Sequence, residues 1–172
     1  MSELDEAWAL ALSEAQQKAR AAGRTDVSEY LALRSSNDLL RQTGIDWLLT
    51  TFTTLAGKAN RAGASLQIEQ QAAHRFPVGT ATMVGRSLTL TFGVRALSIE
   101  AGWPRLPSDG FVRGGGLACA NIKHFGRRAA NAQLLLVRSS AGVPQWFALD
   151  ETGNRSPFSE DRAREQLSIL LG

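Results

Sequence analysis

Cysteine is nearly absent from this chain, and long hydrophobic runs are absent altogether. The 172 residues contain one cysteine, Cys119, which excludes an intrachain disulfide. No window approaches the roughly 20 consecutive apolar residues that a membrane-spanning helix needs. The first six residues include three acidic ones, Glu3, Asp5 and Glu6, and lack the basic start and the apolar run of a secretory signal. We therefore expect a reduced, cytoplasmic protein that has no membrane partner.

Histidine and clustered carboxylates, on which most catalytic and metal sites depend, are also scarce. The two histidines, His74 and His124, lie far apart and have no cysteine or second histidine at metal-ligand spacing. The middle of the chain holds three carboxylates, Glu69, Glu100 and Asp109, which poorly supports a paired-carboxylate hydrolase. We expect no catalytic residues, no metal and no cofactor, so the prediction leans away from an enzyme.

The charged side chains are distributed unevenly. Residues 1–60 carry six basic and eight acidic side chains, a net charge of −2, and residues 150–172 carry three and five, again −2. Residues 61–149 carry ten basic side chains against three acidic ones, a net charge of +7. This segregation indicates either an anionic partner or a basic middle segment that packs against the chain's own acidic helices.

Apolar residues at three- and four-residue spacing predict helices at both ends of the chain. The first stripe predicts a helix from about residue 3 to residue 22, which ends at Gly23. A second stripe ends at Gly63, with an expected new helix start at Ser35 and an expected break at Gly44. A last helix is expected within 158–171.

After Gly63 the apolar period changes to two, which is typical of half-buried antiparallel strands. The sequence therefore predicts a single α+β domain over 1–172, helical over 1–62 and β-rich and basic over 64–150. We expect two or three N-terminal helices and a meander-like antiparallel sheet of about five or six strands. One C-terminal helix, within 158–171, should pack on one face of that sheet.

The segment 113–128 is the most unusual stretch of the sequence. Three consecutive glycines, Gly114–Gly116, allow backbone amides to converge on an anion, although the phosphate-loop and dinucleotide patterns are absent. A flexible loop or a bulged strand is the interpretation that we favour. Basic side chains in and near this segment are the candidate anion-binding or partner-binding residues, namely Arg105, Arg113, Lys123, His124, Arg127 and Arg128.

Two tryptophans and the cysteine carry further predictions. Trp103 begins an irregular, proline-containing connection over 103–110, where it either plugs the end of the sheet or is exposed at a recognition surface. We favour the plug and keep Trp103 as an exposed-aromatic candidate. Trp47 lies on a helical stripe and is expected in the core. Cys119, between two alanines, is expected to be a buried hydrophobe rather than a nucleophile.

Three function hypotheses follow. The first is a non-catalytic binding or adaptor domain, of a bacterial type, that acts through a basic sheet face or through the 103–110 and 113–128 loops. Its partner would be a protein, a second copy of the chain or an anionic ligand. The second is a small-ligand or enzymatic pocket between the sheet and its helices, which would be lined by Cys119, His124, Glu100 or Arg105. Nucleic-acid binding ranks third, because it requires the basic side chains to share one face.

Overall fold

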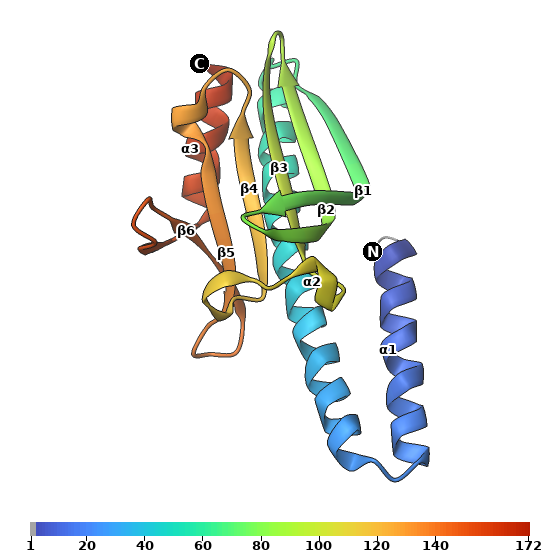
Figure 1. The fold of residues 1–172 in the computed structure, drawn as a ribbon. Helices are drawn as coiled ribbons and strands as arrows, with labels where there is room; N and C mark the ends of the chain where they lie inside the picture. The colour runs from blue at the N-terminus through green and yellow to red at the C-terminus, as the bar shows by residue number, and fades with distance from the viewer. Residues whose placement is uncertain (1–2) are drawn as a thin grey trace.

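The computed structural model describes residues 3–172, which form three α-helices and a seven-stranded antiparallel sheet (Figure 1). Two helices, α1 (Glu3–Ala21) and α2 (Thr25–Arg61), precede the sheet, and α3 (Glu160–Leu171) follows it. The strands pair in chain order as β1 (Gln67–Val78), β2 (Ala81–Phe92), β3 (Arg95–Trp103), β4 (Ala118–His124), β5 (Ala132–Arg138), β6 (Pro144–Leu149) and β7 (Arg155–Pro157). The α+β meander prediction is confirmed, with one or two strands more than expected.

The second helix is one continuous element of 37 residues, so the predicted new start at Ser35 and the predicted break at Gly44 are wrong. Leu136 of β5 packs directly on Gly44, where an added Cβ would lie 2.6 Å from a Leu136 methyl carbon. The indole of Trp146 also donates a 2.7 Å hydrogen bond to the Gly44 carbonyl oxygen. The glycine lets helix and sheet approach closely, and this packing outweighs its poor helix propensity. Among residues 3–172, no helix combines the length and the apolar character that crossing a bilayer requires.

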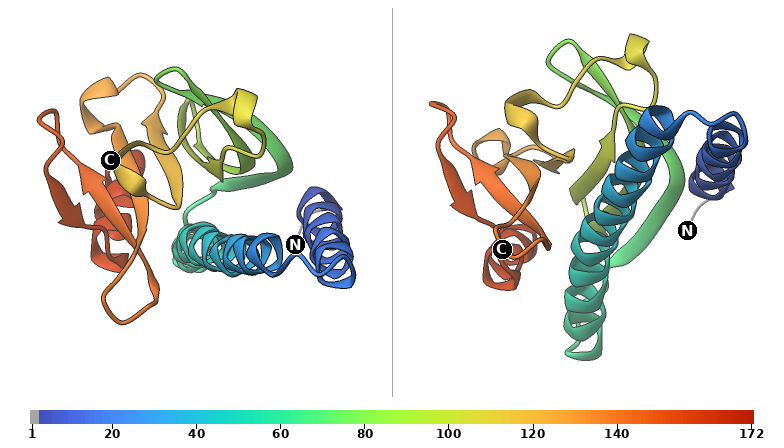
Figure 2. Two further views of the ribbon diagram at one scale, coloured as in Figure 1. Left: turned by 60° about the horizontal axis from the view of Figure 1, so that its bottom comes forward. Right: turned by 90° about the horizontal axis from the view of Figure 1, so that it is seen from below.

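The main core lies between the sheet and the two helices α2 and α3, which lie on the same side of the sheet (Figure 2). Large side chains with almost no exposed surface come from both layers, and they include Phe52, Leu48, Leu90, Ile99, Ile122 and Leu170. Each such side chain contributes roughly 1.5–3 kcal/mol when it is buried. The C-terminal helix therefore packs on one sheet face as predicted.

The first helix is more peripheral. It runs beside α2 (Figure 1), and its buried residues are Asp5, Leu12 and Ala19. Trp47 on α2 is 41% exposed, so the prediction that it belongs to the core is wrong. The buried stripe of α2 instead passes through Leu48 and Phe52. Exposed apolar side chains on these helices are available for contact with another molecule.

The opposite face of the sheet, called here the second face, is partly covered by the sheet itself. In β1 the pairing register shifts between Gln71 and His74, and the second half of the strand runs across the sheet (Figure 1). Gly85 and Gly102 are directly paired where β2 and β3 curve beneath it. Because a bulge bends a strand and glycine permits close backbone approach, these positions allow the sheet to curl over its own second face.

Residues 118–124 form β4, a central strand between β3 and β5, so over this stretch of 113–128 the loop alternative is wrong and the strand alternative is right. Every residue of β4 except Lys123 is buried. Helices α2 and α3 cover one face of β4. The hairpin of β1 and β2, which curls over the second face, covers much of the other. A strand that is buried on both faces lacks the alternation of apolar and polar residues that reveals a half-buried strand.

Candidate functional site

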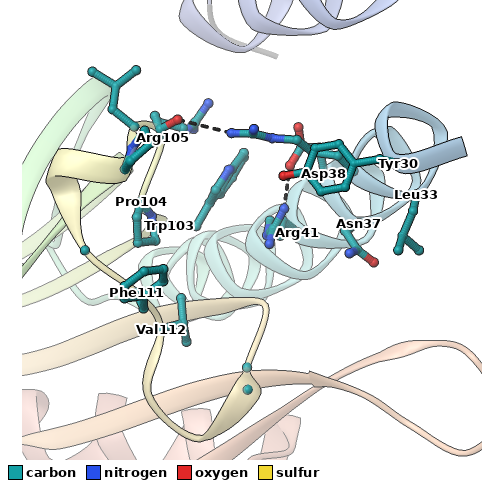
Figure 3. A pocket seen from close by; sticks show the side chains of 16 residues that line it. Tyr30, Leu33, Asn37, Asp38, Arg41, Trp103, Pro104, Arg105, Phe111 and Val112 are labelled. Atoms are coloured by element: carbon teal, nitrogen blue, oxygen red, sulfur yellow. Dashed lines mark hydrogen bonds and ion pairs between the residues drawn. The ribbon is translucent and has the colours of Figure 1, made fainter. Parts of the chain in front are cut away.

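A groove of about 430 Å³ lies between the first half of α2 and the 104–116 connection (Figure 3). We call it the α2 groove. Its inner wall is formed by Trp103, three arginines and one carboxylate, and its rim is formed by apolar side chains. The residues that matter for its chemistry are Tyr30, Leu33, Arg34, Asp38, Arg41, Trp103, Arg105, Leu106 and Phe111.

The 104–116 connection is held in a defined shape. Its buried residue Asp109 accepts hydrogen bonds at Oδ2 from the backbone N–H groups of Arg105 at 3.2 Å and Leu106 at 3.1 Å. Gly110 follows with φ of 92°, a conformation that favours glycine, and it packs closely on Ala81. These contacts hold one wall of the α2 groove in a fixed shape.

Trp103 is buried, with 3% of its surface exposed, so the favoured plug is right and the exposed-aromatic alternative is wrong. The guanidinium of Arg105 stacks on the indole, with its Cζ 3.5 Å from the ring centroid. On the same ring lies Arg41, with its Cζ 5.9 Å from the centroid. The tryptophan therefore closes the end of β3 and supports two cations through its π face.

Arg105 is the most buried cation of the groove. Its Nη2 donates to Asp5 Oδ1 at 2.9 Å and to the Val84 carbonyl oxygen at 3.1 Å. Burial lowers the pKa of Arg105 against the opposing effect of Asp5, but arginine remains charged at neutral pH. Nη1 is buried and has no hydrogen-bond partner among residues 3–172. A buried N–H group of this kind is costly unless water or a ligand accepts its hydrogen bond.

The other two arginines come from α2. Arg41 donates to the Leu117 carbonyl oxygen at 2.7 Å and to Asp38 Oδ1 at 2.6 Å. Arg34 donates to the Arg105 carbonyl oxygen at 3.3 Å, as a dashed line in Figure 3 shows, and makes no ion pair within the described part of the chain. Asp38 and Asp5 balance Arg41 and Arg105, which leaves about one net positive charge at the groove.

The rim of the α2 groove is apolar and open to solvent. Phe111 is 84% exposed and Tyr30 is 60% exposed, and Leu33 and Leu106 are exposed to a similar extent as Tyr30. They flank the arginines from two sides, because two belong to α2 and two to the connection. Aromatic and arginine side chains together are the composition that protein interfaces favour.

The structure does not bring the predicted basic residues together. Arg105 and Arg113 lie in the connection that borders the α2 groove, but only Arg105 lines it. Lys123 lies on the second face and pairs with Glu100. Arg127, with Phe125, lies at the opposite end of β4 beside the last turn of α3.

Two further predicted residues differ in their surroundings. His124 is buried, and its Nε2 lies 2.5 Å from the Gln166 side-chain oxygen, whereas Arg128 is exposed. The alternative hypothesis places a small-ligand or enzymatic pocket between the sheet and its helices, where the main apolar core lies. Cys119, His124 and Arg105 each line a different cavity.

A cluster of polar side chains surrounds Glu100 on the second face. The carboxylate is 4% exposed and accepts contacts from Lys123 at 2.6 Å, from His74 at 2.9 Å and from Asn121 at 3.4 Å. Burial alone would raise the pKa of Glu100, but the hydrogen bonds from Lys123 and His74 outweigh it and hold the pKa below its ordinary value. Glu100 is therefore an ionised, fully surrounded carboxylate at neutral pH.

This cluster predicts a pH-dependent contribution to stability. Because the folded-state pKa of Glu100 is lowered, its stabilisation is present above the ordinary value of 4.5 and is lost as the pH falls below it. Glu100→Gln should be less stable than the natural chain at neutral pH, and the gap should narrow in acid. Urea unfolding midpoints at a series of pH values measure this. Glu69→Gln, at an exposed position of β1, is the matched control. A gap that stays constant with pH would contradict the prediction.

Sequence reasoning missed the α2 side of the groove. Tyr30, Arg34, Asp38 and Arg41 recur at three- and four-residue spacing, so they share one face of the helix. That stripe of one aromatic and three charged residues was available as a signal. The opposite wall of the groove gave no such signal, because the 104–116 connection has no periodic pattern of residues.

The chain matches no known family model, no curated protein sequence and no solved structure.

Proposed function

We propose that this chain is a non-catalytic binding domain, and that its α2 groove holds a segment of a partner protein. The segment would carry one carboxylate among apolar side chains. The observation that carries this proposal is the combination of stacked arginines in the groove wall with an exposed apolar rim at Tyr30 and Phe111.

The charge balance supports a single acidic group in the ligand. With Arg41 and Arg105 already paired to Asp38 and Asp5, the groove offers about one uncompensated positive charge, that of Arg34. A carboxylate would be attracted by that charge and would accept charge-assisted hydrogen bonds from guanidinium N–H groups of the arginines. A nucleic-acid backbone is a poorer fit, because several phosphates require several uncompensated cations along one surface.

The rim supports a protein partner rather than a small ion. Phe111 and Leu106 on one side face Tyr30 and Leu33 on the other, and all four side chains are mostly exposed. Covering such side chains removes apolar area from water, and this burial is the usual source of affinity at the centre of an interface. An inorganic anion would leave that area exposed.

Peptide binding tests the proposal. Blocked peptides with glutamate between leucine and phenylalanine residues should shift the Trp103 indole N–H signal in nuclear magnetic resonance spectra. Matched peptides with lysine in place of glutamate should leave it unchanged. Phe111→Ser should weaken binding by about tenfold, because a well-placed aromatic contact contributes on the order of 1.4 kcal/mol.

Val143→Ser is the control, because Val143 is also an exposed apolar residue but lies in the β5–β6 turn, away from the groove. It should bind the glutamate peptides as the natural chain does. Equal responses to the glutamate and lysine peptides, or equal loss in Phe111→Ser and Val143→Ser, would refute the α2 groove as the binding site.

A further inference from the structure

A second cavity of about 430 Å³ lies on the second face of the sheet and shares no lining residue with the α2 groove. Its floor is formed by β4, β5 and β6, and its walls by the β1–β2 turn, the connection at 113–114 and the β6–β7 turn. The volume falls within the range that is usual for small-molecule sites. We call it the second-face cavity.

Opposite charges line this cavity without meeting. Arg113 and Arg155 form the positively charged set of lining residues, and Asp150 and Glu151 form the negatively charged set. No ion pair joins the two sets within the described part of the chain. Arg155 instead donates to the Gly114 carbonyl oxygen at 3.2 Å. A ligand with both a positive and a negative group would satisfy both sets.

The floor of the cavity carries two side-chain amides next to each other. Asn121 and Gln133 are directly paired across β4 and β5, and both line the cavity. The ionised Glu100 accepts a hydrogen bond from Asn121 Nδ2 at 3.4 Å, which orients the amide. Among residues 3–172, the Asn121 side chain makes this hydrogen bond through Nδ2 and none through Oδ1. Oδ1 is the atom that remains to accept an N–H group from a ligand.

The remaining floor is apolar. Leu135, Leu149 and Val78 line the cavity, and they belong to or pack against a small buried cluster around Phe76 and Met83. Preformed pockets of this kind usually combine such an apolar surface with a few polar groups that fix the ligand's orientation. The second-face cavity therefore offers an apolar contact, an amide pair and charges of both signs in one place.

We propose that the second-face cavity binds a short zwitterionic peptide with free amino and carboxyl ends. The carboxylate lies toward Arg113 and Arg155, and the ammonium group toward Asp150 and Glu151. The peptide amide meets the carboxamides of Asn121 and Gln133, and an apolar side chain packs on the leucines of the floor. This inference stands independently of the α2 groove.

Cys119 provides a built-in reporter, because it lines the cavity and is the chain's one cysteine. It is buried, and desolvation raises the pKa of its thiol to about 11, so alkylation is slow in the free protein. A ligand that occupies the cavity must slow alkylation further, because the thiol then reacts only after the ligand has left.

The experiment measures iodoacetamide alkylation of Cys119 by mass spectrometry in the full chain. Leucyl-leucine with free ends should slow it by about tenfold at ten times its dissociation constant, and should also raise the melting temperature. N-acetyl-leucyl-leucine lacks the ammonium group, and leucyl-leucine amide lacks the carboxylate. Both should protect Cys119 much less, and free leucine, which lacks the amide bond, should also protect it less.

Arg113→Gln and Glu151→Gln each remove one charge from an exposed position, so both variants should fold and lose protection. Arg128→Gln is the matched control, because Arg128 is exposed and does not line the cavity. The proposal is overturned if leucyl-leucine gives no protection at millimolar concentration. It is also overturned if the blocked dipeptides protect equally, or if Arg128→Gln loses as much protection as Arg113→Gln.

Discussion

Gly85→Ala should lower the free energy of unfolding by about 3 kcal/mol or more, the largest effect that we expect from a single methyl group. A Cβ at Gly85 would lie 1.9 Å from the carbonyl oxygen of Ala101 and 2.6 Å from the Cα of Gly102. These are backbone atoms, so they cannot rotate away as a side chain can. The strands β2 and β3 would have to separate where the sheet curls, and urea unfolding would show the loss.

Gly57→Ala is the matched control for this prediction. Gly57 lies inside α2, and the nearest atom to an added Cβ is a guanidinium nitrogen of Arg61 at 3.7 Å, an ordinary contact. Alanine should therefore stabilise the chain by about 0.5–1 kcal/mol, because glycine loses more conformational entropy in a helix. If the free energy of unfolding changed only slightly in both Gly85→Ala and Gly57→Ala, β2 and β3 would be able to move apart at Gly85 at little cost in stability.

Arg105→Leu should lower the free energy of unfolding by about 3–5 kcal/mol, because it removes the arginine from a buried ion pair. Asp5 is 5% exposed, and its 2.9 Å contact with Arg105 joins α1 to the end of β3. The Val84 carbonyl oxygen also loses its hydrogen bonds from Arg105. Because α1 has few other buried residues, faster hydrogen exchange should appear first in that helix.

Arg75→Leu is the control for the buried ion pair. Arg75 reaches Asp109 at 3.4 Å, but its side chain is 65% exposed. An ion pair that is open to solvent contributes about 0–1 kcal/mol, so this variant should unfold at nearly the same urea concentration as the natural chain. Equal losses in Arg105→Leu and Arg75→Leu would contradict the role assigned to the buried pair.

Local sequence patterns predicted most of the architecture. The alternation of Leu88 and Leu90 with threonines, and the helical stripe that ends near Gly23, depend on residues within one element. The failures came where tertiary contacts reversed a local preference. Gly44 was expected to break a helix, yet Leu136 packs on it and Trp146 donates to its carbonyl oxygen. For the residues of β4, a loop and a bulged strand remained alternatives, because burial on both faces removed the alternation.

The candidate sites were predictable only in part. Arg105 was selected for its charge and does line the α2 groove, but Trp103 is buried under it rather than exposed. Arg34 and Arg41 were passed over because they lie in a net acidic part of the chain. No sequence pattern signals a groove formed by a helix and a connection 71 residues away.

The sequence alone determined the α+β fold class, the succession of helices, strands and a last helix, and the basic character of the middle segment. These properties follow from side-chain type and spacing, which act over a few residues. The tertiary structure decided which charges meet. It paired Arg105 with Asp5 across 100 residues and gathered Glu100, His74 and Lys123 from three strands. It also placed Arg113 and Asp150, 37 residues apart in the sequence, in the lining of one cavity.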